Sequence, residues 1–141
     1  MRYACLVCFE GSIFDTLSPA QKEELDRDSL DYDEELARRG HLVHAEALQS
    51  PEAAITVRVR NGKLSTTDGP FAETKEQVGG VVLIEARDLN EAVQLAAGIP
   101  LARLGSIEVR PILEIPYPAE KGAPGERAGT SPVTTPARLE S

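Results

Sequence analysis

The sequence predicts a single α+β domain, and two observations support this prediction. Residues 2–9 (RYACLVCF) and 80–84 (GVVLI) are apolar on both alternating faces, which is typical of central strands covered on both sides. The predicted elements follow the order strand, helix, strand, hairpin, strand, helix, strand. With the hairpin set aside as an insertion, this order is βαββαβ, the ferredoxin-like split motif. That topology places its first and third strands in the middle of the sheet, and these are the two apolar segments.

Two helices are predicted from their starting signals. Ser18 is a good N-cap, a proline follows at the first helical position, and Gln21 can complete a capping box. The first helix then extends to about Arg39. A second capping box over residues 88–91 starts a shorter helix that ends at Gly98.

The middle of the chain predicts a strand and a hairpin. Residues 41–48 form the strand, and residues 55–60 alternate with their apolar side chains on one face. Asn61 and Gly62 then give the strongest short signal for a tight hairpin turn. We therefore expect residues 52–67 to form a half-buried hairpin.

The end of the chain changes in character. The last strand is predicted over residues 107–115, where Pro111 lacks a backbone donor and so places the strand at a sheet edge or bulge. Past Pro116 the chain is rich in Pro, Gly, Ser and Thr, with too little apolar surface to offset the entropy of ordering. We expect a folded domain over residues 1–116 and a disordered tail over residues 117–141.

Composition excludes several classes of partner. The chain has 141 residues, is 41% hydrophobic and carries a formal charge of −8, which argues against a nucleic-acid surface. No segment approaches the roughly 20 apolar residues of a membrane span, and the N-terminal apolar run is too short for a signal peptide. We expect a cytoplasmic protein with neither nucleic-acid nor membrane partners.

Cys5 and Cys8 form a CxxC pattern, but their surroundings predict a strand. Positions i and i+3 of a strand point to opposite faces, so the two sulfurs cannot share a metal ion or an easy disulfide. Both are expected to be small buried apolar side chains. With only two histidines and these two cysteines, we predict neither a metal site nor a cofactor.

The predicted topology leaves one sheet face uncovered. Both helices of a βαββαβ unit cover the same face, so the other face of the two central strands would expose a large apolar patch. A second copy of the sheet, packed face to face about a two-fold axis, is the simplest cover. We therefore expect a homodimer built as an α+β barrel.

Several motifs resemble one known family. They are DGPFAETKE at residues 68–76, Gly79-Gly80, VRVRNG at residues 57–62, IPLA at residues 99–102 and GSIEVRP at residues 105–111. Together they resemble the YCII-related family in its DGPF-containing branch, over residues 1 to about 114. The resemblance implies a bacterial, dimeric, ferredoxin-like α+β barrel of generally unassigned activity, often encoded beside extracytoplasmic-function sigma factors.

The resemblance also bears on catalysis. Some relatives carry a histidine on the first helix paired with an aspartate, which has suggested an acid-base enzyme. The corresponding residues 28–31 here read DSLD, without a histidine. This chain instead has His44 and Glu46 on its second strand.

Three residues are candidate catalytic groups. His44 and Glu46 are two apart on a strand and should project to one face about 7 Å apart, so the carboxylate can prepare the imidazole for acid-base work. The alternative is an exposed ion pair on a sheet edge. Asp68 could act on a ligand at the mouth of the barrel, or hold the turn at Gly69. His41 should lie on the other face, exposed at the strand start.

Four residues are candidate ligand-binding groups. Phe71, Glu73 and Lys75 combine an aromatic anchor with alternating charges, which fits a ligand site, a dimer contact or an ordinary solvated loop. Arg58 shares a face with Arg60 and could bind an anion, although a solvated face is the simpler interpretation.

Two functions are consistent with these features. The first is a small-molecule-binding protein or enzyme with acid-base groups in a cleft of a dimeric α+β barrel. The alternative is a non-catalytic adaptor that binds another protein, such as a sigma factor, through its tail or its acidic first helix. From residue 19 to residue 39 that helix carries eight acidic residues against four basic ones.

Overall fold

The computed structural model describes residues 1–116 and 118. Four strands form one antiparallel sheet in the order β2-β5-β1-β6, and β3 and β4 form a separate hairpin. The βαββαβ order with an inserted hairpin is confirmed, and so are the central positions of β1 and β5. The elements are β1 (Arg2–Phe9), α1 (Pro19–Arg38), β2 (Leu42–Ala47), β3 (Ile55–Arg60), β4 (Lys63–Asp68), β5 (Gln77–Glu85), α2 (Leu89–Ala97) and β6 (Ser106–Pro111).

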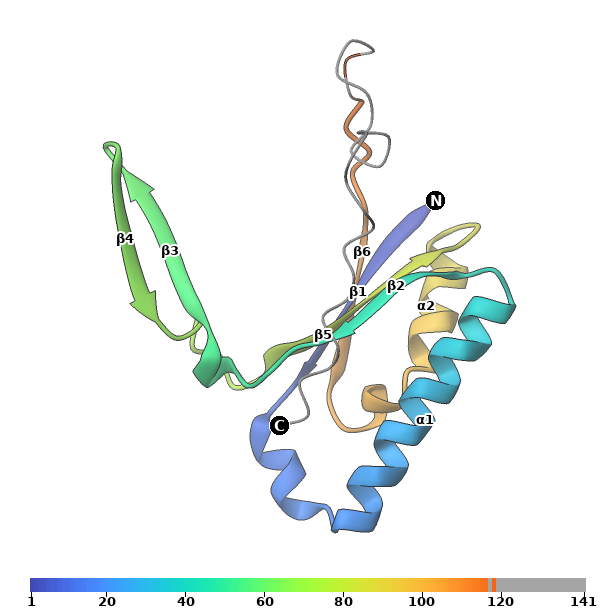
Figure 1. Cartoon of the computed structure of the whole chain (residues 1–141). Coiled ribbons are helices and arrows are strands. Elements are labelled where there is room, and N and C mark those ends of the chain that lie inside the picture. The colour runs from blue at the N-terminus through green and yellow to red at the C-terminus, as the bar shows by residue number, and fades with distance from the viewer. Residues whose placement is uncertain (117, 119–141) are drawn as a thin grey trace, which may run out of the picture.

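Both helices pack on the same face of the sheet (Figure 1). The core between them draws on alternate residues of the central strands, Tyr3, Cys5 and Val7 from β1, and Val82 and Ile84 from β5. Leu36 of α1 and the α2 residues Ala92, Leu95 and Ala96 close the core from the helix side.

Capping fixes where the helices start, and one hydrogen bond joins them. Ser18 Oγ accepts from the Gln21 N–H at 3.1 Å, while the Ser18 N–H donates to Gln21 Oε1 at 2.8 Å, so the predicted capping box is confirmed. The Tyr32 hydroxyl donates to the Leu95 carbonyl at 2.6 Å. Burial of this phenol raises its pKa.

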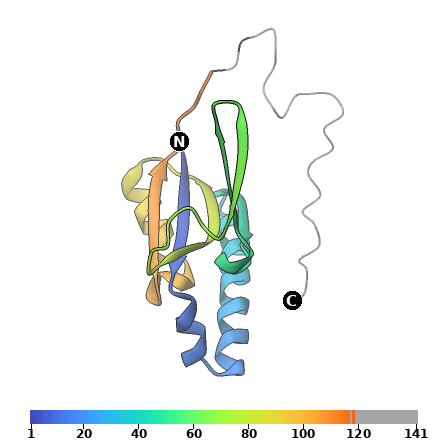
Figure 2. The same cartoon turned by 90° about the vertical axis from the view of Figure 1, so that its left-hand side faces the viewer.

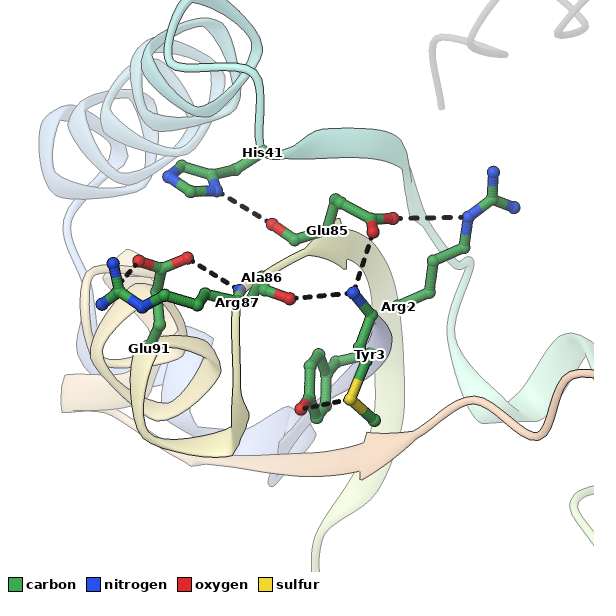
Figure 3. Close-up of polar contacts among 8 residues, drawn as sticks. Arg2, Tyr3, His41, Glu85, Ala86, Arg87 and Glu91 are labelled. Atoms are coloured by element: carbon green, nitrogen blue, oxygen red, sulfur yellow. Dashed lines mark hydrogen bonds and ion pairs between the residues drawn. The ribbon is translucent and has the colours of Figure 1, made fainter.

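The end of the sheet remote from the hairpin is held by polar contacts around Glu85 (Figure 3). The Met1 ammonium donates to Glu85 Oε1 at 2.9 Å and lowers the pKa of that carboxyl. His41 Nδ1 lies 2.8 Å from the Glu85 carbonyl oxygen. His41 is thus half-buried and tied to β5, rather than simply solvent-exposed.

The hairpin differs from the prediction in its burial. Its turn is as expected, with Asn61 and Gly62 both at positive φ, 52° and 72°. The expectation of a half-buried face is wrong for the single chain, because the hairpin stands clear of the sheet in Figure 1. Figure 2 views the domain from the side on which the hairpin lies. Its apolar side chains Ile55, Val57, Val59 and Leu64 are 58–68% exposed.

Cys5 and Cys8 lie on opposite faces of β1, as predicted. Cys5 is fully buried under the helices, and burial raises the pKa of its thiol to about 11. Cys8 is half-buried on the other face, where burial and the carboxylates of Glu108 and Glu76 raise its thiol pKa. Cys5 therefore stays a neutral thiol at physiological pH.

The predicted disordered tail, residues 117–141, lies outside the described residues apart from Pro118. Within residues 1–116, neither helix has the length and apolar character needed to cross a membrane.

Gly105 gives a test of how closely β6 approaches β1. A Cβ at this position would overlap the backbone carbonyl oxygen of Cys8 and press on Phe9, so Gly105→Ala should lower the free energy of unfolding by about 1 to 3 kcal/mol. Gly11→Ala is the matched control, because its Cβ would meet nothing within 4 Å. Equal urea midpoints for the two variants would contradict this packing.

Candidate functional site

His44 and Glu46 lie together on the sheet face that the helices leave uncovered. In β2, His44 pairs with Leu83 and Glu46 with Val81, so both point away from α1 and α2. His44 Nε2 is 3.0 Å from Glu46 Oε1, and the two side chains are 55% and 39% exposed. The expected pairing of an imidazole with a carboxylate on one face is therefore present.

This uncovered face is apolar in its middle and charged at both edges. Ala4, Leu6, Val81 and Leu83 occupy its centre, together with Cys8. On the far edge, Glu108 and Arg110 of β6 pair with Leu6 and Ala4, and their charged groups lie 3.9 Å apart. We call this surface the open face.

The loop of residues 69–76, which carries the GPFAETKE motif, is held by Gln77 at the start of β5. The Gln77 side-chain amide donates to the Ala72 carbonyl at 3.0 Å, and to the carbonyl and hydroxyl of Thr74 at 2.8 and 3.1 Å. Thr56 of β3 donates to the Gly69 carbonyl at 2.9 Å and fixes the other end of the loop. Gly69 has a φ of 99°, a backbone conformation that glycine adopts easily and in which a residue with a side chain would be strained.

Residues of this loop line two grooves. The first groove has a volume of about 610 Å³ and begins at Leu48, two residues beyond Glu46 along the chain. Its lining is mostly apolar, and Glu76 is its charged member. The second groove has a volume of about 470 Å³, and Glu73 and Lys75 are among its lining residues. Pro51, Pro70, Thr74 and Gln77 line both grooves.

The predicted ligand-binding residues gather around the loop. The Arg58 guanidinium lies 5.3 Å from the centre of the Phe71 ring, a cation–π distance, and Phe71 lines the first groove while remaining 78% exposed. Lys75 Nζ lies 3.4 Å from Glu10 Oε1 and so ties the loop to the end of β1.

Asp68 lies apart from these groups. It is the last residue of β4, opposite Ile55, and lines neither groove. Its side chain forms no hydrogen bond with the turn within the described part of the chain, so the turn-holding alternative is not observed there. The predicted catalytic groups therefore fall into a close pair and one separate carboxylate.

Sequence reasoning missed two residues of this region. Gln77 organises the loop through hydrogen bonds to Ala72 and Thr74, which depend on how the loop folds back over it. Glu10 was also missed, because its partner Lys75 lies 65 positions along the chain. Neither contact has a local sequence signal.

These features define an α+β protein of ferredoxin-like topology with an imidazole–carboxylate pair on an uncovered sheet face. Residues 1–116 match the YCII-related domain, and the chain belongs to that family. It is similar to "Uncharacterized protein R00369" of Rhizobium meliloti (strain 1021), with 36% identity over 114 residues. The match covers 79% of this chain and 92% of the relative.

Replacing Gln77 tests its role in the loop. Gln77→Ala removes three hydrogen bonds of about 1 kcal/mol each, so amide hydrogen exchange of residues 72–76 should accelerate at least about tenfold. Gln94→Ala, on the exposed surface of α2, is the control. Unchanged exchange in the Gln77 variant would show that other contacts hold the loop.

Proposed function

We propose that this protein is a homodimer that binds a small molecule beside the open face, with His44 as its acid-base group. The observation that carries the proposal is the 3.0 Å contact between His44 Nε2 and Glu46 Oε1. Imidazole is the side chain best suited to proton transfer near neutral pH, and a carboxylate that contacts one ring nitrogen orients the ring.

The first groove supports this proposal as the place where the ligand body would lie. Leu48 lines the groove and follows Glu46 by two residues, a separation of about 7 Å along an extended chain. A mostly apolar cleft of a few hundred Å³ with a few polar groups is typical of small-molecule sites. In this proposal Phe71 contacts the ligand body, and Glu76, Gln77 and Thr74 supply the polar contacts.

A second copy of the chain would complete this site. His44 and Glu46 stand on the open face, where the described part of the chain lies beneath the sheet and leaves them exposed. Excluding water from such a pair would strengthen its electrostatic interactions with a bound ligand. The apolar centre of the open face, with Leu6, Val81 and Leu83, favours face-to-face packing of two sheets about 10 Å apart. The partner's open face would then form the wall opposite His44.

A thermal-shift screen against a metabolite library tests the proposal. A ligand at 100 times its Kd adds about 2.7 kcal/mol to the free energy of unfolding, so it should raise the Tm of the wild type by several degrees. The shift should be lost in His44→Ala and reduced in Glu46→Gln. It should persist in His41→Ala, because His41 contacts the Glu85 carbonyl at the remote end of the sheet.

Two results would count against acid-base binding at His44. One is a broad library in which no compound raises the Tm of the wild type. The other is a ligand whose shift survives His44→Ala unchanged, which would separate the binding site from the His44 and Glu46 pair.

A further inference from the structure

The hairpin β3–β4 exposes an apolar face that nothing in the described chain covers. Residues paired across an antiparallel hairpin share a face, and the pairs Val59 with Leu64, Val57 with Thr66 and Ile55 with Asp68 form one of them. The four apolar side chains of this face are 58–68% exposed. A lone two-stranded hairpin is marginally stable in water, so this face favours packing against another surface.

The opposite face of the hairpin is basic. It carries Arg58, Arg60 and Lys63 with hydroxyl residues between them and no acidic side chain. Arg60 and Lys63 pair directly across the tip, on either side of the Asn61-Gly62 turn. This concentration of positive charge stands out in a chain whose formal charge is −8.

The acidic surface of the same chain is α1. Between Pro19 and Arg38 it carries eight acidic residues against three basic ones. Glu23 is paired with Arg27, whereas the exposed Asp31 and Glu34 form no ion pair within residues 1–116. We call the hairpin β3–β4 the arm. The chain therefore carries an arm with a basic face and a helix with an acidic surface, which are complementary in charge.

The arm has the length to join these two surfaces in a dimer. A strand of six residues spans about 20 Å, stacked sheets lie about 10 Å apart, and a helix layer adds about 10 Å. In Figure 1 the hairpin rises on the side of the sheet away from α1 and α2, which is the side of the open face. An arm that starts there can pass a partner's sheet and reach its helix layer.

We infer that the hairpin is a dimerisation arm that clasps a second copy of this chain. Its apolar face, built on Ile55, Val57, Val59 and Leu64, packs along the edge of the partner's sheet. Arg60 and Lys63 lie at the tip of the opposite face, and their long side chains extend past the packed apolar region to the acidic surface of the partner's α1. The inference rests on the dimer of the proposed function, and adds the contacts that hold it.

The dimer dissociation constant of the full chain tests the arm. Arg60→Glu with Lys63→Glu should raise this constant at least tenfold at low salt, with a smaller change at 0.5 M NaCl, because charge pairs near a surface are screened. Val57→Thr, which keeps a β-branched side chain, should also weaken the dimer. Adding Asp31→Lys and Glu34→Lys to the tip variant should restore association.

Arg103→Glu is the control, since it reverses an exposed basic residue outside the hairpin. Circular dichroism and Tm check that each variant remains folded. Tip and Val57 variants that dimerise as tightly as the wild type would overturn the arm while leaving a dimer in place. A wild type that never dimerises would overturn both the arm and the dimer. The His44 site would still be supported in that case if a ligand bound the wild type and His41→Ala but not His44→Ala.

Discussion

The structure depends on one constraint, that a βαββαβ sheet receives both of its helices on the same face. β1 and β5 are central and apolar on both sides, and only the side with Tyr3, Cys5 and Ile84 is sealed by α1 and α2. Burying that side supplies the hydrophobic free energy that holds the domain together. The same arrangement leaves Leu6 and Val81 on a face that neither helix covers.

Each feature of functional interest is arranged around that uncovered face. The pair of His44 and Glu46 stands on one edge of it, and Glu108 and Arg110 stand on the other. The first groove begins where β2 leaves the sheet, and the hairpin rises from the same end of the sheet (Figure 1). A second copy on the open face would therefore enclose the acid-base pair, narrow the groove and meet the arm in a single association step.

Local patterns predicted the parts of this protein that local physics determines. Ser18 caps α1 because its hydroxyl satisfies a free helix N–H, and Asn61 with Gly62 adopts the left-handed angles that a tight turn requires. The alternation along β2 also placed His44 and Glu46 on one face. The burial of the hairpin could not be predicted, because periodicity identifies an apolar face but not the surface that covers it. The role of Gln77 was missed for a related reason, since its hydrogen bonds depend on how the loop folds back over it.

In the proposed dimer, a second copy of the chain shelters the open face. Sedimentation equilibrium of the wild type across a micromolar dilution series measures this most directly. We expect a particle of about 30 kDa, twice the 15.2 kDa mass of one chain. A single species of 15.2 kDa throughout the series would contradict it, because the apolar centre of the sheet would then face water.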